Sequence, residues 1–174
     1  MRLFVGLPVP DALAQGLART ARALDLPNAR WTPAENLHLT LFFLGQVSED
    51  KLPMILGELG QLDFAPLELR FTQLGCFPRA GILFADLEPT PTLLRLQADV
   101  ALGMVKCGFA SDARPYHPHV TLARMRSPMR LDSRLTALTS QLQQRFTVAA
   151  VNLYRSQTLS TGAQYEIIAV KRAG

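Results

Sequence analysis

The chain has 174 residues, of which 48% are hydrophobic; this is enough for one substantial core and excludes a disordered polymer. The net charge of +4 permits an anionic partner without requiring one, and the basic residues are arginines except for Lys51, Lys106 and Lys171. No apolar run approaches the length of a membrane span, and Pro8 and Pro10 interrupt the first one too early for a signal peptide, so we expect a cytoplasmic protein.

The first half of the chain alternates strand and helix patterns. In order, these patterns predict a strand over 2–8, a helix over 11–25, a strand over 37–44, a helix over 49–62 and a strand over 67–74. Gly45 ends the second strand, and Ser48 is a suitable N-cap for the second helix. The last strand alternates apolar and polar residues, which predicts that one of its faces is exposed.

The second half repeats this order. Its patterns predict a strand over 82–87, a helix from the Thr90 N-cap to about 106, a strand over 119–124, a weaker helix over 132–145 and strands over 147–155 and 164–171. The shared order predicts an α+β internal duplication, with repeats of about 1–80 and 81–174 in a single bilobal domain spanning 1–174. We expect two antiparallel or mixed sheets that face a central cleft, with helices on the outside.

A short phrase occurs twice, as His38-Leu39-Thr40-Leu41 and as His119-Val120-Thr121-Leu122, and the copies start 119 − 38 = 81 residues apart. The chain has three histidines, and the phrases contain two of them. Because residues i and i+2 share a face of a strand, each copy presents an imidazole beside a hydroxyl. One such pair on a strand is usually inert, but two at matched positions favour a shared site.

Two opposed histidines can act as base and acid, because imidazole titrates near neutral pH. A hydroxyl can donate a hydrogen bond to an anionic oxygen, so the pairs suit a tetrahedral anion such as phosphate, without a metal. His117, two residues before His119, has a spacing that could bind a metal. Since no cysteine or acidic cluster adjoins it, we expect an orienting or surface histidine there instead.

At these residues the sequence resembles the 2H phosphoesterase superfamily, and within it the bacterial and archaeal RNA 2′,3′-cyclic phosphodiesterases, also called 2′-5′ RNA ligases. The similar stretches are Arg2-Leu3-Phe4-Val5-Gly6-Leu7, Asn36-Leu37-His38-Leu39-Thr40-Leu41-Phe42-Phe43-Leu44-Gly45, Arg114-Pro115-Tyr116-His117-Pro118-His119-Val120-Thr121-Leu122-Ala123-Arg124, and Leu153-Tyr154-Arg155-Ser156 with Gly162 and Tyr165. The resemblance covers essentially the whole chain, and both motifs are intact.

The resemblance implies a bilobal fold that hydrolyses a 2′,3′-cyclic phosphate at an RNA end to a 2′-phosphate, and a reversible, ATP-independent joining of RNA ends through a 2′-5′ linkage. It implies no cofactor. His38 is expected as proton donor and His119 as proton acceptor, while Thr40, Thr121 and Arg124 hold the phosphate. Strand parity places Arg124 on the face opposite His119, so this role requires a bulge or twist near Ala123.

Aromatic side chains are expected to stack on the bases of single-stranded RNA. The candidates are Phe42, which strand parity puts on the His38 face, together with Trp31, Phe77 and Tyr154, each of which could instead serve local packing. Parity places Phe43 in the core. A basic track along an RNA backbone could include Arg79, Arg126, Arg130 and Arg155.

Three alternative functions remain open from the sequence, and a metal-dependent hydrolase ranks third among them. The same chemistry could act on a small substrate, either a cyclic mononucleotide or an ADP-ribose cyclic phosphate. A non-catalytic RNA-end binding module is a second alternative, although the presence of both histidines and both threonines weighs against it. The sequence has no repeated stripe of exposed apolar residues that would indicate an obligate oligomer, so we expect a monomer.

Overall fold

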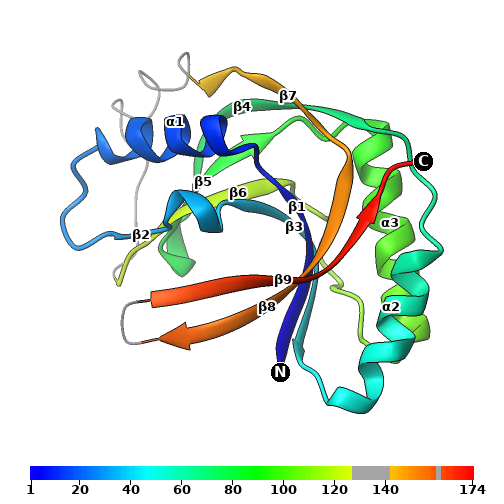
Figure 1. Ribbon diagram of the computed structural model, residues 1–174. Coiled ribbons are helices and arrows are strands. Elements are labelled where there is room, and N and C mark those ends of the chain that lie inside the picture. Colours follow the sequence, from blue (N-terminus) through cyan, green and yellow to red (C-terminus); the bar gives the residue numbers. More distant parts are fainter. Residues whose placement is uncertain (127–141, 160–161) are drawn as a thin grey trace.

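Nine strands form one continuous antiparallel sheet in the part of the chain that the computed structural model describes, namely residues 1–126, 142–159 and 162–174 (Figure 1). Their order is β7-β4-β5-β6-β3-β1-β8-β9, and β2 pairs with β6 off this path. The α+β class is confirmed. The sheet is one path of strands, and not the two separate sheets that the sequence predicted.

The described strands have the following bounds: β1 Arg2–Pro8, β2 Arg30–Trp31, β3 His38–Gln46, β4 Leu67–Phe77, β5 Ile82–Leu87, β6 His119–Arg124, β7 Arg145–Val148, β8 Ala150–Leu159 and β9 Gly162–Arg172. The described helices are α1 Asp11–Arg22, α2 Leu52–Gly60 and α3 Pro91–Lys106. Within the described ranges, no helix is long and apolar enough to cross a membrane.

Most predicted elements occur near their expected positions, and the differences have local causes. In place of the expected strand over 147–155, the structure has two strands, β7 and β8. The chain ends β7 at Val148 and crosses to the other end of the strand order, where β8 begins at Ala150. The expected helix over 132–145 lies mostly outside the described residues, as does Arg130, and Arg145 belongs to β7. The two-residue strand β2 was missed because so short a segment has no periodicity.

The helix caps differ between the two halves. The Thr90 side chain accepts a hydrogen bond from the Leu93 backbone amide, and Pro91 follows at the first helical position, as predicted for α3. Ser48 instead precedes a short 3-10 turn at Glu49–Lys51 and makes no capping bond with its side chain. The second helix therefore begins only at Leu52.

The two His-x-Thr strands meet in the middle of the sheet. Leu39 of β3 pairs with Val120 of β6, and both side chains are fully buried in the single apolar core. The Tyr116 hydroxyl adds a second link, because it donates a hydrogen bond of 2.9 Å to the Thr40 carbonyl oxygen. Since β3 and β6 are antiparallel neighbours, the histidines and threonines flanking this pair project from one face.

Each of these strands contains a bulge one residue after its threonine. On β3, Thr40 pairs with Gly6 and Phe42 with Val5, so Leu41 is the extra residue. On β6, Thr121 pairs with Phe84 and Ala123 with Leu83, so Leu122 is the extra residue. A bulge reverses the alternation of faces beyond it, so it changes where the next side chains of each strand point; on β3 a second irregularity at Leu44, between the pairs Phe43–Phe4 and Gly45–Leu3, follows.

Gly6 allows β3 to approach β1 closely beneath the first motif. A Cβ atom at Gly6 would lie 2.8 Å from the Leu39 carbonyl oxygen and 3.5 Å from the His38 ring. Because the nearer atom belongs to the backbone of the partner strand, the contact cannot be relieved by rotating a side chain.

We predict that Gly6→Ala lowers the free energy of unfolding by about 1–3 kcal/mol, since overpacking forces the backbone to shift. Urea denaturation measures this change. Gly57→Ala is the matched control: a Cβ atom there meets nothing within 4 Å, and alanine favours the α2 helix, so its stability should be equal or higher. Equal stability of Gly6→Ala and wild type would contradict the prediction.

Candidate active site

His38 is held by two hydrogen bonds on opposite sides of its ring. Its Nδ1 lies 2.7 Å from the Asn36 carbonyl oxygen, and its Nε2 lies 3.1 Å from Thr40 Oγ1. A carbonyl oxygen can only accept, so Nδ1 carries the hydrogen, and the Nε2 lone pair of the neutral ring accepts the threonine hydroxyl. The imidazole and hydroxyl that the sequence predicted to share a face are therefore in direct contact.

Aromatic rings enclose His38. The ring centroids of Phe4, Tyr165 and Tyr154 lie 4.5, 5.1 and 5.6 Å from that of His38. This burial lowers the pKa of His38 to about 4; the Asn36 carbonyl acts in the opposite direction, and the nearby His119 lowers it further. In the free protein, His38 is therefore neutral at pH 7.

His119 has an equivalent hydrogen bond and a more highly charged neighbourhood. Its Nδ1 donates to the His117 carbonyl oxygen at 2.8 Å, and its ring packs against Phe77 and Phe84, with centroid distances of 5.2 Å to each. Burial is the largest cause of a lowered pKa for His119. The carboxylate of Asp86 acts against this effect, whereas Arg124 adds to it.

His117 is paired with a carboxylate. Its Nε2 lies 2.5 Å from Asp86 Oδ1, and the Asp86 side chain is only 14% exposed. The Asp86 carboxylate and the His119 ring lie on the same face, because the two residues are direct cross-strand partners. Among the residues that the structure describes, no group of three or more His, Cys, Asp or Glu is arranged to hold a metal ion.

The bulge at Leu122 brings Arg124 to the face of His119. Leu122 and Ala123 are both buried, so the alternation restarts and Arg124 is exposed, close enough to His119 to affect its pKa. The bulge that this role required near Ala123 is therefore present. The phosphate-binding role itself stays a prediction.

The matching bulge at Leu41 overturns the expected placement of Phe42 and Phe43. Phe42 is 7% exposed and belongs to the core, so it cannot stack on a base from the His38 face. Phe43 is 53% exposed, pairs with Phe4, and carries the Arg2 guanidinium 4.9 Å from its ring centroid. Strand parity gave the reverse assignment because it assumed an uninterrupted strand.

The other aromatic candidates lie in different surroundings. Phe77 is half-buried beside His117 and His119. Trp31 is half-buried in β2 and packs against the core. Tyr154 is 7% exposed with its ring stacked on Phe4 at 4.8 Å, so it forms part of the wall around His38 and leaves no free face for a base.

Three residues near the histidines were missed as site residues. Phe43 was hidden by the bulge. Asp86 reaches the site because β5 pairs with the distant β6, and Tyr165 reaches it because β8, the hairpin partner of its strand, pairs with the distant β1. The double aromatic Phe42-Phe43 after the motif was a usable signal, since a bulge would expose one ring or the other. No local pattern could have identified Asp86.

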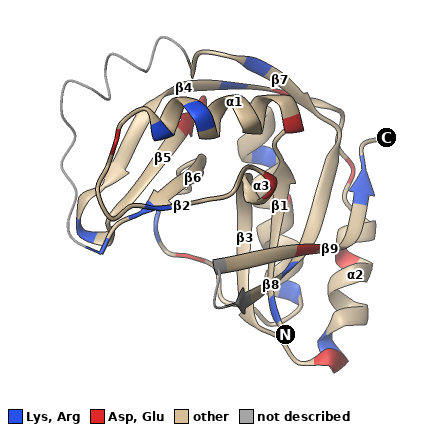
Figure 2. Cartoon of the chain, turned by 60° about the vertical axis from the view of Figure 1, so that its left-hand side comes forward, with Lys and Arg blue, Asp and Glu red and all other residues tan. Residues whose placement is uncertain are grey.

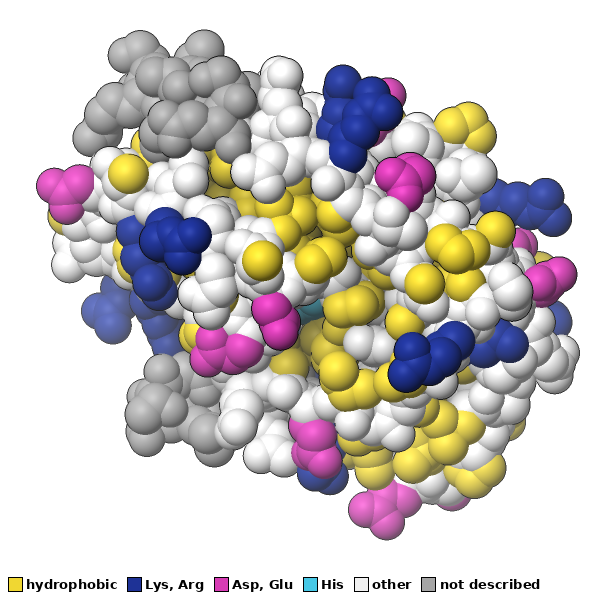
Figure 3. All heavy atoms as spheres, turned by 45° about the horizontal axis from the view of Figure 1, so that its top comes forward, with side chains coloured by type: hydrophobic (Ala, Val, Ile, Leu, Met, Phe, Trp, Pro, Cys, Tyr) yellow, Lys and Arg dark blue, Asp and Glu magenta, His cyan; other side chains and the backbone are white. Residues whose placement is uncertain are grey.

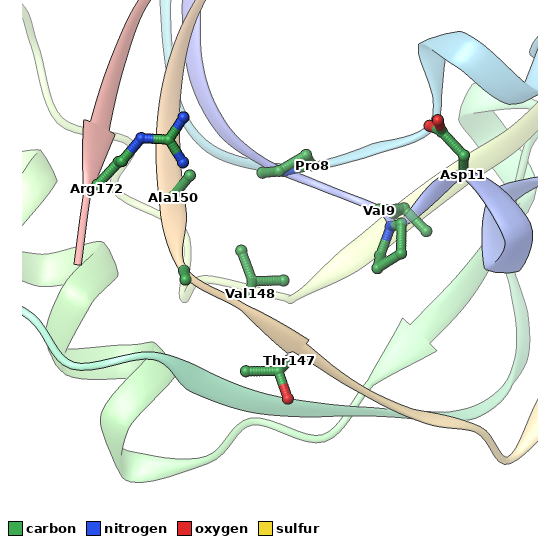
Figure 4. Close-up of a pocket in the computed structure, with 9 residues that line it drawn as sticks. Pro8, Val9, Asp11, Thr147, Val148, Ala150 and Arg172 are labelled. Carbon is green, nitrogen blue, oxygen red and sulfur yellow. The ribbon is translucent and has the colours of Figure 1, made fainter.

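A histidine side chain lies at the bottom of a hollow in the surface, bordered by hydrophobic and acidic side chains (Figure 3). A separate pocket of about 430 Å³ is lined by the turn from Pro8 to Asp11, the segment from Thr147 to Ala150, and Arg172, with Arg172 and Asp11 on opposite sides (Figure 4). None of the predicted site residues lines this pocket, although Pro8 is the cross-strand partner of His38.

Residues 9–158 match the family described as the 2′-5′ RNA ligase superfamily. The chain belongs to this superfamily. It is 30% identical over 127 residues to the RNA 2′,3′-cyclic phosphodiesterase of Bacillus subtilis, covering 70% of this chain and 69% of that protein. It is also 25% identical over 173 residues to the protein of the same name from Methanocaldococcus jannaschii, covering 97% and 98% of the two chains.

The superfamily fold is also apparent from a solved structure. The crystal structure of Escherichia coli LigT complexed with 3′-AMP has a TM-score of 0.84 to this chain, with 24% sequence identity and coverage of 99% of this chain and 97% of LigT. This similarity establishes the fold across the whole length, in agreement with the match of the sequence to the superfamily.

The low pKa of His38 predicts how the free energy of unfolding of this protein depends on pH. The unfolded chain protonates this group near pH 6.5 and the folded chain near pH 4, so the folded state loses stability as pH falls from 6.5 to 4. In His38→Gln this contribution is absent, so the loss of unfolding free energy between pH 7 and pH 4.5 should be smaller. Urea denaturation at both pH values measures it.

A direct measurement accompanies this comparison. The histidine ring resonances can be followed by NMR between pH 3.5 and pH 8, and the resonance that His38→Gln removes should titrate near pH 4. Titration of that resonance near pH 6.5 would show that water reaches the ring and would contradict the enclosure by Phe4, Tyr154 and Tyr165.

Proposed function

We propose that this protein hydrolyses the 2′,3′-cyclic phosphate at the end of an RNA chain and leaves a 2′-phosphate. One observation carries the proposal: two histidine–threonine pairs lie on one face of the sheet, on adjacent strands joined at Leu39 and Val120. Each ring has its Nδ1 hydrogen committed to a backbone carbonyl, so Nε2 is the nitrogen of each ring that gains or loses a proton; on His38 it holds the Thr40 hydroxyl in the free protein.

The reaction needs a proton acceptor and a proton donor on opposite sides of phosphorus. We assign His119 as the acceptor, which takes a proton from water as the water oxygen forms a bond to phosphorus. His38 is the donor: it takes up a proton at Nε2 from solvent when the anionic substrate binds, and gives that proton to O3′ as the P–O3′ bond breaks. The product keeps its phosphate on O2′, and no oxidant or reductant is required. When an RNA 5′-hydroxyl attacks phosphorus in place of water, the same bond to O3′ breaks and a 2′-5′ linkage forms; attack of O3′ on that linkage reverses the joining.

The surroundings of the two histidines support these roles. Burial keeps both rings neutral in the free protein, which suits His119 as a base. A bound phosphodiester would place a negative charge beside His38 and raise its pKa, which is the change that a proton donor needs. The aromatic rings around His38 strengthen this interaction, because they replace part of the water that would otherwise screen it.

The phosphate oxygens are assigned to three side chains. Thr40 and Thr121 present hydroxyl groups on the face of the histidines, and Arg124 lies on the same face beyond the Leu122 bulge. Their equivalent positions on β3 and β6 support an internal duplication of the chain, whose two lobes would each supply half of the site. An arginine suits the developing charge because its planar fork can bind two oxygens.

Phe43 is the base-stacking residue that the geometry favours. It occupies the position on β3 that Arg124 occupies on β6, five residues after the histidine and beyond the bulge. Its exposed ring can stack on the terminal base. Basic residues also lie along β2 and the adjacent end of β6, where Arg30 pairs with Arg124, and they can contact the RNA backbone (Figure 2).

The relatives support an RNA substrate over a small nucleotide. The similar proteins of B. subtilis and M. jannaschii are both RNA 2′,3′-cyclic phosphodiesterases. E. coli LigT, which shares the fold, has been crystallised with 3′-AMP. The phosphate of 3′-AMP is on O3′, one of the two oxygens that a 2′,3′-cyclic phosphate joins. The exposed Phe43 and the nearby arginines fit a terminal nucleotide that is attached to a chain.

We predict that His38→Ala and His119→Ala each reduce hydrolysis of a 2′,3′-cyclic-phosphate oligonucleotide by at least about 10²-fold, because each removes one proton-transfer group. Hydrolysis rates at pH 7, in excess chelator, measure the effect, and the phosphate position of the wild-type product is assigned by phosphorus NMR. Circular dichroism confirms that each variant is folded. Undiminished hydrolysis by either folded variant would overturn the two-histidine mechanism.

Phe43→Ala and Phe42→Ala should separate base stacking from packing. Loss of stacking at the exposed Phe43 should raise KM for the oligonucleotide about tenfold or more, with little change in stability. Phe42→Ala empties a core position and should cost about 3–5 kcal/mol of unfolding free energy. Steady-state kinetics and urea denaturation give both quantities; the opposite pattern would show that Phe42 is the stacking residue.

A further inference from the structure

The residue two positions before each histidine has the same double contact in both motifs. Its backbone carbonyl accepts the Nδ1 hydrogen of the histidine, and its side chain is tied to a different strand. In the first motif this residue is Asn36, and in the second it is His117. The side chains are chemically unrelated, yet both connect the segment before the histidine to the rest of the sheet.

Asn36 connects the first motif to the β8–β9 hairpin. It is 7% exposed, and its Nδ2 donates a hydrogen bond of 2.7 Å to the Ala163 carbonyl oxygen of β9. Two residues further along β9, the Tyr165 ring packs edge-on against His38 at 5.1 Å. The side chain of Asn36 therefore holds in place both the carbonyl that orients His38 and the strand that covers it.

His117 connects the second motif to β5. Its Nε2 bonds to Asp86 Oδ1, while Asp86 Oδ2 accepts a hydrogen bond of 3.2 Å from Gln73 Nε2 on β4. The His117 ring also packs edge-on against Phe77 at 5.5 Å and Phe84 at 5.3 Å. These contacts fix the backbone at His117, whose carbonyl in turn orients His119.

We propose that Asn36 and His117 are positioning residues, each of which fixes the backbone carbonyl that holds a catalytic imidazole in its working tautomer and orientation. The inference rests on the proposed function, since it takes His38 and His119 as the proton-transfer groups. A carbonyl that shifts would release the Nδ1 hydrogen, and the ring would then populate the other tautomer or rotate away from Nε2 transfer.

The test for the first motif is Asn36→Leu, which keeps the size of the side chain and removes its donor. We expect kcat for cyclic-phosphate hydrolysis to fall about 10–100-fold, with KM changed less than threefold. The imidazole ¹⁵N shifts of His38 should show a mixture of tautomers. Its pKa should rise as the hairpin loosens and water enters; the titratable groups facing this ring are His119 on β6, Tyr154 on β8 and Tyr165 on β9.

Gln97→Leu is the matched control for Asn36→Leu. Gln97 Nε2 also donates to a backbone carbonyl, that of Leu41 on the same strand β3, at 3.3 Å, but it does not contact either histidine. Its loss should lower stability while leaving kcat and the ¹⁵N shifts of His38 unchanged. If both variants lowered kcat equally and left those shifts unchanged, Asn36 would have only a general packing role and the proposal would be wrong.

The test for the second motif compares His117→Ala with His117→Gln. The alanine variant should lose about tenfold or more in kcat, whereas glutamine, whose amide can still donate to Asp86, should recover most of it. Both variants remove the His117 charge, which lowers the pKa of His119, so the pH–rate limb of His119 should move in both, and only the alanine variant should also lose kcat at the plateau; the charged groups facing His119 are His117, Asp86 and Arg124. Glu88→Ala is the control, because it breaks the Glu88–Arg70 ion pair two residues beyond Asp86.

The NMR measurement separates failure of this inference from failure of the proposed function. Tautomer shifts in Asn36→Leu together with an inactive wild type would support the positioning role and refute the cyclic-phosphate substrate. Wild-type activity together with unchanged tautomers and equal kcat in Asn36→Leu and His117→Ala would refute the positioning role and leave the function standing.

Discussion

The site depends on one constraint, the antiparallel pairing of β3 with β6 at Leu39 and Val120. This pair lies in the middle of the sheet and is fully buried, so a slip of one residue would move the histidines to the core face and apolar residues such as Leu39 and Val120 to the surface. The cost of exposing the core therefore fixes the register, and the register fixes the direction of all four motif side chains. The Tyr116–Thr40 hydrogen bond adds a second tie across the same junction.

The two bulges convert this symmetric frame into a site with two different ends. Each follows the threonine and reverses the alternation of faces, which brings Phe43 out on β3 and Arg124 out on β6. In the proposed function, the aromatic ring at one position binds the base and the guanidinium at the other binds the phosphate of one nucleotide. A regular strand would have buried Phe43 and pointed Arg124 away, so the bulges matter as much as the motifs themselves.

The histidines differ because their neighbours differ. His38 is surrounded by the rings of Phe4, Tyr154 and Tyr165, whereas His119 shares its face with Asp86 and Arg124. Burial lowers both pKa values, but charge can modify that of His119 directly while His38 responds mainly to what enters its apolar enclosure. This difference gives the two nearly equivalent motifs distinct responses to a bound phosphate, which the proposed division into donor and acceptor requires.

The sequence by itself determined the α+β class, most strands and helices, and the pairing of each histidine with its threonine, because all of these follow from periodicity over a few residues. It also indicated that Arg124 needs a bulge to reach His119. Only the tertiary structure decided that the sheet is continuous, that Phe43 and not Phe42 is exposed, and that Asp86, Tyr165 and Ala163 act on the motifs. Those outcomes depend on strand pairing between segments that are distant in sequence. A bulge likewise arises from the register of two strands together, so the local sequence pattern of a single strand does not predict it.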